Sequence, residues 1–170
     1  WKPANYTKRF YGPSIMRVGI EKSRNLMTAR LAMTIGMDRV QDYAKRFGLN
    51  DDLPPFLSMS LGAGETTLLR LTSAYGMLVN GGRKITPSLI DRIQDRHGKT
   101  IYRHDARDCG SCVAADGWSN QPIPTLPDSR EQLTDPASAF QMVSMLEGVI
   151  KRGTGRSINA LNLVVAGKTG

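Results

Sequence analysis

Apolar positions recur with the period of an α-helix through the first half of the chain. Residues 12–23 place Ile15 and Val18 on one face, with Ser14 as the expected cap of the first turn. Residues 24–36 continue as a second helix, which we expect to end at its glycine. The apolar residues of this second segment are Leu26, Ala29, Leu31 and Met33.

Two further helices are predicted on either side of a proline-containing connection. Residues 38–48 carry apolar side chains at i, i+3, i+4 and i+7 and end at a glycine. Residues 66–82 form the next helix, with Thr66 or Thr67 as its N-cap and a glycine pair at its end. The apolar positions of the first of these helices are Val40, Tyr43, Ala44 and Phe47.

Beyond position 82 the period changes. Residues 87–104 indicate two short strands joined by a turn, in which Gly98 supplies a positive φ. Pro, Asp, Ser and Gly dominate residues 105–134, which predicts a long loop or insertion. A helix follows over 135–153, with Asp135 as its cap and Pro136 in its first turn. Its expected apolar side consists of Phe140, Val143, Met145 or Leu146, and Ile150.

The final run, LNLVVAGKTG at 161–170, is the strongest strand candidate. Helices followed by a few strands predict an α/β protein of the α+β type. We expect mostly a helical lobe plus part of an antiparallel sheet, with the final run as an edge of that incomplete sheet.

Composition limits the class of protein. The chain has 170 residues, of which 40% are hydrophobic, and this suits one domain or most of one. Its longest apolar runs are shorter than the roughly 18 to 20 residues that a bilayer-spanning helix needs. Because the chain starts at Trp1 and ends within an expected strand, we expect both ends to be boundaries within a longer protein.

The net charge of +8 favours a polyanionic neighbour, such as nucleic acid, lipid headgroups or an acidic envelope polymer. However, lysines and arginines are scattered, and aromatic residues make up only 6% of the chain. Without a stacking platform or a zinc-finger spacing, the sequence argues against nucleic-acid binding.

Cys109 and Cys112 could form a disulfide, supply half of a zinc site with His97 and His104, or remain thiols. Both cysteines lie on one Gly/Asp-rich loop without a second spaced ligand pair. A disulfide or free thiols are therefore favoured over zinc, and we expect an exposed loop remote from any site.

A strand that ends in Lys168, Thr169 and Gly170 suits the edge of a cleft. The lysine offers a fixed cation to a substrate carboxylate, the threonine hydroxyl donates to the same group, and the glycine lets a ligand backbone lie against the strand. The same three residues are also an ordinary strand end followed by a turn.

A second polar cluster, Ser23-Arg24-Asn25, lies at the junction of two expected helices. Ser23 can act as a helix cap, and Asn25 can begin the next helix. A hydroxyl and an amide at this spacing can also point into one cavity. There the hydroxyl would pass a proton, and the amide would hold a neighbouring lysine and a peptide carbonyl.

Ser-Arg-Asn followed much later by Lys-Thr-Gly resembles the second and third signatures of the serine acyltransferases that penicillin inhibits. The resemblance covers nearly the whole chain and is to the class A penicillin-binding proteins. It extends through WKPANYTKRFYGPSIMRVGIEKSRNLMTARLAMTIGM, SLGAGETTLLRLTSAYGMLVNGG, RIQDRHGKTIY and MLEGVIKRGTG. The CGSC insertion is similar to that of some alphaproteobacterial members.

The family's nucleophile motif, Ser-x-x-Lys, is absent, because no serine is followed by lysine three positions later. In the family this motif precedes the Ser-x-Asn triplet. The resemblance therefore implies that residues 1–170 are part of a penicillin-binding/β-lactamase-like transpeptidase domain, with the nucleophile segment and the final strands outside it. Such a fragment is expected to be inactive alone.

The resemblance implies a peptidoglycan D,D-transpeptidase that cross-links stem peptides through a serine acyl-enzyme and is acylated by β-lactams, without a cofactor. Carried over by residue, Ser23 relays a proton, and Asn25 orients the absent lysine and the substrate amide. Lys168 and Thr169 bind the terminal carboxylate, and Gly170 lets the stem lie along the strand.

The same resemblance implies a location at the periplasmic face of the bacterial inner membrane, with the anchor outside these residues, and partners among cell-envelope assembly proteins. Two alternatives stay open. One is a D,D-carboxypeptidase or β-lactamase of the same fold, and the other is a non-catalytic basic binding or scaffold module. A Ser-x-x-Lys motif upstream of Trp1 would favour the enzyme.

Overall fold

A computed structural model describes residues 1–107, 120, 122–123 and 125–170. The chain divides into two compact units, one formed by residues 1–85 and 132–170 and the other by residues 86–131. Each unit is described by itself.

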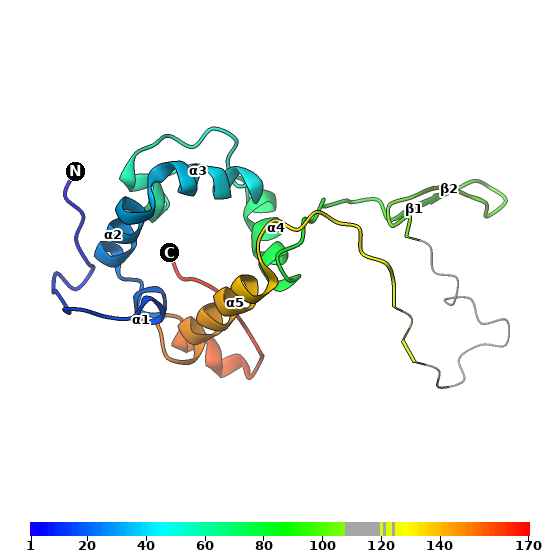
Figure 1. The fold of residues 1–170 in the computed structure, drawn as a ribbon. Helices are drawn as coiled ribbons and strands as arrows, with labels where there is room; N and C mark the ends of the chain where they lie inside the picture. The colour runs from blue at the N-terminus through cyan, green and yellow to red at the C-terminus, as the bar shows by residue number, and fades with distance from the viewer. Residues whose placement is uncertain (108–119, 121, 124) are drawn as a thin grey trace. The chain divides into compact units, whose positions relative to one another are not determined.

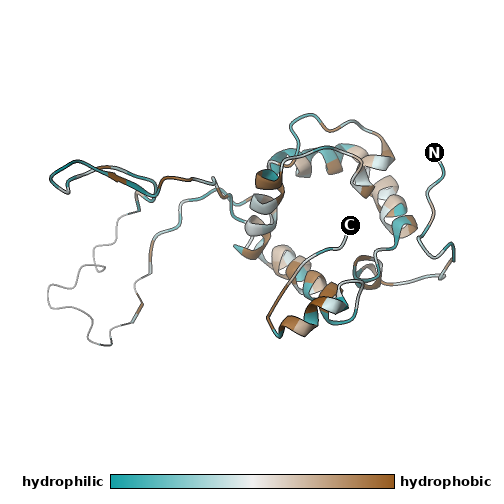
Figure 2. Ribbon diagram, turned by 180° about the vertical axis from the view of Figure 1, so that it is seen from behind, coloured by the Kyte–Doolittle hydropathy of each residue, from teal (hydrophilic) through white to brown (hydrophobic). Residues whose placement is uncertain are grey.

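The larger unit is helical, and its α-helices follow one another around a ring (Figure 1). In chain order its elements are α1 (Met16–Glu21), α2 (Asn25–Ile35), α3 (Met37–Arg46), the 3-10 helix η1 (Leu57–Leu61), α4 (Leu68–Val79), α5 (Pro136–Lys151) and the 3-10 helix η2 (Arg156–Leu161). Figure 2 shows hydrophobic and hydrophilic positions interspersed along these helices, as expected where one face is buried. Within the described residues, no helix is both long and apolar enough to cross a bilayer.

Local capping chemistry fixes several helix ends where the sequence predicted them. The Thr67 side chain accepts from the Arg70 amide at the start of α4, and Asp135 accepts from the Ser138 amide at the start of α5. α2 ends at Gly36, whose φ of +90° suits a residue without a side chain. The predicted Ser14 cap is wrong, because α1 starts after Ile15 and the Ser14 hydroxyl donates to the Gly12 carbonyl instead.

One cluster of the core closes the unit where the chain leaves it and returns. Leu133 is 2% exposed and packs with Phe47, Ala74 and Met77. Its amide donates to the Gly82 carbonyl at 2.8 Å, which joins the end of α4 to the segment that leads into α5. This packing therefore joins residues 1–85 to residues 132–170, the two stretches of sequence that form the larger unit.

The buried face of α5 agrees with the prediction at Met145, Leu146 and Ile150, which are all buried. The prediction for Phe140 is wrong, since this residue is 73% exposed and Ala139 is buried in its place. Adjacent residues of a helix point about 100° apart, and an apolar face of about that width can begin at either of them, so helical spacing alone does not decide between the two.

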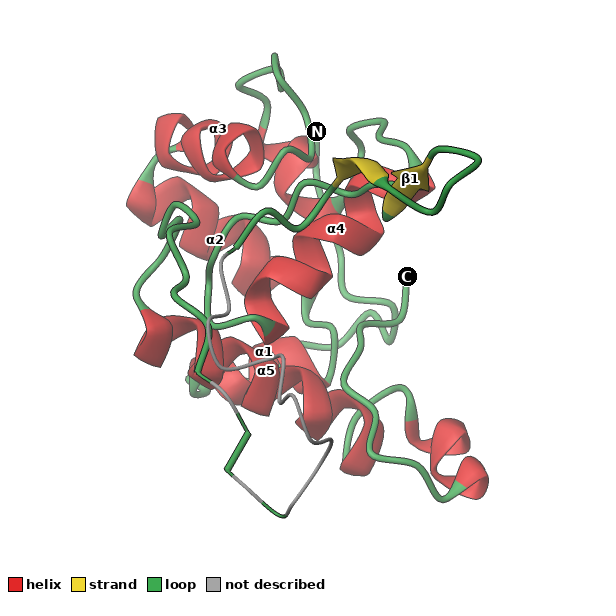
Figure 3. Ribbon diagram, turned by 90° about the vertical axis from the view of Figure 1, so that its right-hand side faces the viewer, coloured by secondary structure: helices red, strands yellow, loops and turns green. Residues whose placement is uncertain are grey.

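The second unit contains the predicted hairpin, with β1 (Arg92–Gln94) antiparallel to β2 (Thr100–Arg103). Ile93 pairs with Tyr102, and Gly98 has the expected positive φ of 82°. Figure 3 draws these strands in yellow. The insertion predicted over 105–134 stays a prediction, and Cys109 and Cys112 lie outside the described residues.

The strand predicted over 161–170 is wrong. Leu161 ends η2, and residues 162–170 have no ladder partner among the described segments. Their backbone is instead held to α5, where the Gly167 amide donates to the Leu146 carbonyl at 3.3 Å. A β-strand needs a neighbour to pair with, and apolar alternation cannot supply one.

The helices α1 and α5 approach closely at two glycines. A Cβ on Gly148 would overlap the Glu21 carboxylate, and one on Gly153 would overlap the Glu21 carbonyl oxygen. Gly153 is also packed against backbone atoms of Val149. Because backbone atoms cannot move aside as a flexible side chain can, Gly153 is needed for the α1–α5 contact.

Replacing Gly153 with alanine should therefore destabilise the domain by about 2 kcal/mol or more, because the new methyl group overpacks a backbone contact. The measurement is chemical denaturation of the full-length protein that carries this chain. Gly167→Ala is the matched control, because the nearest atom to its added Cβ lies 4.0 Å away. Equal stability of the two variants would contradict the close approach.

Candidate active site

Ser23 lies in a backbone turn that ends α1. Its φ is +50°, in the left-handed region. The Ser23 amide donates to the Ile20 carbonyl at 3.1 Å, and the Arg24 amide donates to the Gly19 carbonyl at 2.8 Å. This pair of bonds is the Schellman motif, in which glycine usually occupies the left-handed position. A serine there is strained by about 1 kcal/mol, and such strain is concentrated at functional sites.

The interpretation of Ser23 as an N-terminal helix cap is not what the structure contains, because Ser23 follows α1 and the N-cap of α2 is Arg24. Arg24 itself lies over the Tyr11 ring, with its guanidinium carbon 3.1 Å from the ring centroid. The prediction that Asn25 begins the next helix is confirmed.

Lys168 reaches Ser23 from the other end of the chain. Its Nζ donates to the Ser23 Oγ at 2.7 Å across 145 positions of sequence, and also to the Thr169 carbonyl at 2.6 Å. Partial burial lowers the pKa of the Lys168 ammonium below its usual value, because the charged form loses water. The structure thus brings together Ser23, the first residue of Ser-Arg-Asn, and Lys168, the first residue of Lys-Thr-Gly.

Asn25 has a different neighbour. Its Nδ2 donates to the Ala4 carbonyl at 3.0 Å, while the Leu26 amide donates to the Asn5 Oδ1 at 3.2 Å. Asn5 is 8% exposed. The start of α2 is therefore bound to the N-terminal segment, and no hydrogen bond joins Asn25 to Lys168 among the described residues.

The two residues that follow Lys168 differ in their surroundings. The Thr169 hydroxyl lies 2.5 Å from the hydroxyl of Thr154, and Thr154 belongs to the turn between α5 and η2. A Cβ on Gly170 would meet no atom within 4 Å.

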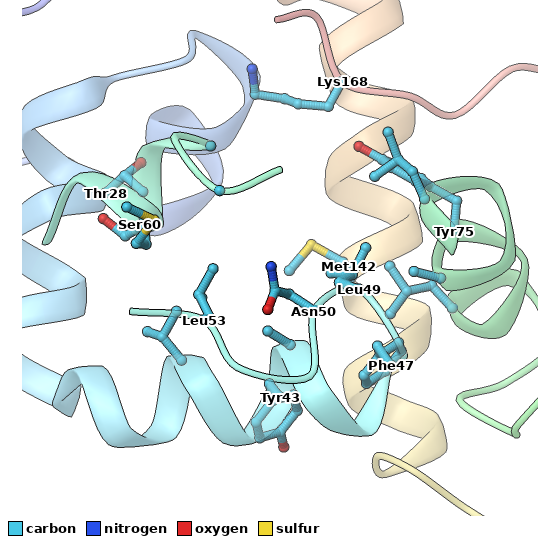
Figure 4. A pocket seen from close by; sticks show the side chains of 18 of the residues that line it. Thr28, Tyr43, Phe47, Leu49, Asn50, Leu53, Ser60, Tyr75, Met142 and Lys168 are labelled. Carbon is cyan, nitrogen blue, oxygen red and sulfur yellow. The ribbon is translucent and has the colours of Figure 1, made fainter. Parts of the chain in front are cut away.

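A cavity of about 980 Å³ lies within the ring of helices, and Ser23 and Lys168 contribute to its wall. The rest of its lining comes from α1 to α5 and the segments between them, and most of it is apolar. Figure 4 shows Lys168 extending over this cavity, with Leu49, Leu53, Phe47 and Met142 among the side chains that line it.

An ion pair beside this site was missed by sequence reasoning. Glu21 is only 4% exposed, and its carboxylate accepts two hydrogen bonds from the Arg152 guanidinium, with Nε to Oε2 at 3.2 Å. Arg152, followed by Arg17, holds the pKa of Glu21 below its ordinary value. The Lys22 ammonium also donates to the Arg152 carbonyl at 2.5 Å. Glu21 and Arg152 are 131 positions apart, so no local pattern could have paired them.

The Ser23 hydroxyl and the Lys168 ammonium thus meet at the wall of a mostly apolar cavity. The family model for the penicillin binding protein transpeptidase domain matches residues 1–170. The chain belongs to this family.

Relatives and solved structures agree with that assignment. Penicillin-binding protein 1A of Rickettsia bellii is 46% identical over 171 residues, which cover 100% of this chain and 22% of the relative. The crystal structure of penicillin-binding protein 1A from Haemophilus influenzae is 27% identical, with a TM-score of 0.74 over 94% of this chain and 26% of that one. The D,D-transpeptidase domain of a peptidoglycan glycosyltransferase from Eggerthella lenta has a TM-score of 0.71 at 20% identity, over 98% of this chain and 43% of that one.

These matches confirm the predicted fold class, an α+β transpeptidase fold of which this chain is a fragment. The chain spans about a fifth of the length of the curated relatives it matches.

The left-handed turn makes a prediction that separates stability from activity. Ser23→Gly should be about 1 kcal/mol more stable than Ser23→Ala, because glycine adopts positive φ without strain. Both variants lack the hydroxyl and should lose acylation by a β-lactam. Denaturation of the full-length protein measures the first effect.

Ser14 provides the matched control, since its φ is not positive. There alanine should be at least as stable as glycine. The same order at both positions would contradict a strained Ser23.

Proposed function

We propose that this chain forms part of a peptidoglycan D,D-transpeptidase that is acylated by β-lactams. The observation that carries the proposal is the 2.7 Å hydrogen bond from Lys168 to Ser23 across 145 positions of sequence. Residues so far apart have no local reason to meet. The protein would act at the periplasmic face of the bacterial inner membrane, on stem peptides and penicillins.

Lys168 supplies the cation that binds the terminal carboxylate of a stem peptide or a β-lactam. An ammonium has three donors, and two of them are directed to the Ser23 hydroxyl and the Thr169 carbonyl. These bonds fix the position of the charge before the ligand arrives. Partial burial reduces screening by water, which strengthens the attraction for a carboxylate.

Ser23 passes a proton to the leaving amine. Because an ammonium can only donate, the Ser23 oxygen must be the acceptor in its bond with Lys168. The hydroxyl proton of Ser23 is then left to be donated to a group on the substrate. A proton donor held beside the reacting bond is what departure of an amine requires.

The attacking serine is supplied from outside this chain, because none of its serines is followed by lysine three positions later. That serine gives its proton to the lysine of its motif and attacks the penultimate D-alanine carbonyl. The C–N bond breaks, D-alanine leaves with the proton that Ser23 relays, and an amine from a second stem peptide resolves the acyl-enzyme. Asn25 uses its Nδ2 on Ala4, so it can offer its carbonyl oxygen to the lysine of the nucleophile motif. Thr169 donates to the carboxylate, and Gly170 leaves room for the stem.

Replacing Lys168 with alanine in the full-length protein should reduce the rate of acylation by a labelled penicillin at least tenfold, which corresponds to about 1.4 kcal/mol in the barrier. The reduction follows from losing both the carboxylate-binding cation and the group that orients Ser23. The measurement is the second-order rate constant of acylation, with the fold checked by thermal denaturation.

Lys45→Ala is the control, since Lys45 lies in the last turn of α3 and is exposed. It should react at the parental rate. Parental acylation of a folded Lys168→Ala variant would remove Lys168 from the site. With stem peptides, a cross-linked product supports the transpeptidase, whereas hydrolysed stems alone would favour a D,D-carboxypeptidase.

A further inference from the structure

The hydroxyl of Thr154 lies beside the proposed site without a role in it so far. Its Oγ1 is 2.5 Å from the Oγ1 of Thr169, the residue that follows Lys168. Thr154 is in the turn between α5 and η2, 15 positions before Thr169.

The backbone of Thr154 is held firmly by its neighbours. Its amide donates to the Glu21 carbonyl at 3.1 Å, and the next amide, that of Gly155, donates to the Val149 carbonyl at 3.0 Å. The preceding Gly153 is buried against the same Glu21 carbonyl. Arg152, two positions before Thr154, pairs with the Glu21 carboxylate. The backbone at Thr154 is therefore attached to the end of α1, and this end lies close in sequence to Ser23.

The direction of the hydrogen bond between the two threonines matters for binding a carboxylate. Each hydroxyl has one proton and two acceptor sites, and an ionised carboxylate can only accept. If Thr169 donates its proton to the carboxylate, it must act as the acceptor in its bond with Thr154. Thr154 must then be the donor.

We propose that Thr154 is a positioning residue, which donates its hydroxyl proton to Thr169 and so directs the Thr169 proton toward the substrate carboxylate. This inference rests on the proposed function, because it takes Thr169 as a carboxylate-binding group. Thr154 does not touch the ligand itself. Because the Thr154 amide is bonded to the Glu21 carbonyl, Thr154 also holds Thr169 at a fixed position relative to Ser23.

The test compares Thr154→Val, which keeps the shape of the side chain but removes the hydroxyl, with Thr154→Ser, which retains the hydroxyl. Both are made in the full-length protein and reacted with benzylpenicillin and with its methyl ester, which lacks the ionised carboxylate. Thr154→Ala is a second hydroxyl-free variant in case valine disturbs the fold.

We expect Thr154→Val to slow acylation by benzylpenicillin about five- to tenfold and acylation by the ester less than twofold. Thr154→Ser should remain within twofold of the parent with both ligands. An equal loss with acid and ester, or a serine variant as slow as valine, would overturn the positioning role and indicate a purely structural one. An unchanged valine or alanine variant would overturn it as well.

Lys168→Ala, assayed in parallel, separates this inference from the proposed function. If Lys168→Ala loses acylation while Thr154→Val does not, only the role of Thr154 fails. If Lys168→Ala reacts at the parental rate, the proposed function fails, and the role of Thr154 fails with it.

Discussion

The contact between the end of α1 and the end of α5 is the constraint on which the site depends. At this contact the carboxylate of Glu21 is buried and accepts from the Arg152 guanidinium, while the Glu21 carbonyl accepts from the Thr154 amide. Removing Arg152 would leave the buried Glu21 carboxylate without its main partner, which is costly because the charge stays buried. Half of the Arg152 side chain is exposed, so water would reduce this cost here. Gly148 and Gly153 are what allow the two helices to come this close.

The same contact places the chemical groups. Ser23 follows Glu21 by two positions and has a left-handed backbone conformation. The turn that contains Ser23 therefore comes directly after the Glu21 carboxylate that pairs with Arg152. On the other side, the turn after α5 places the Thr154 hydroxyl against Thr169. Lys168 then joins the two sides through its bond to Ser23. A strained serine is held in place because the surrounding helices are anchored independently of it.

Features set by neighbours in sequence could be predicted from the sequence. The caps Thr67 and Asp135, the end of α2 at Gly36 and the hairpin turn at Gly98 all depend on residues within a few positions. Features that need a distant partner could not be predicted in this way. The final run has the apolar content of a strand but no described neighbour to pair with, and Glu21 meets Arg152 across 131 positions.

The site residues fall between these cases. The identities of Ser23, Asn25 and Lys168 came from resemblance to a family, whereas composition and spacing left a helix junction and a strand end as ordinary alternatives. Sequence gave no sign that Ser23 occupies a left-handed position, since glycine is the residue expected there. It also gave no sign that the Asn25 amide is bound to Ala4.

The central claim is that Ser23 and Lys168 act as one unit, and a double-mutant cycle tests it most directly. The rates of penicillin acylation are measured for the full-length protein with Ser23→Ala, with Lys168→Ala and with both changes. The account predicts that the double variant is hardly slower than the slower single variant, with a coupling of at least about 1 kcal/mol, or roughly fivefold. Losses that simply multiply would mean that the two residues act independently, and would contradict the account.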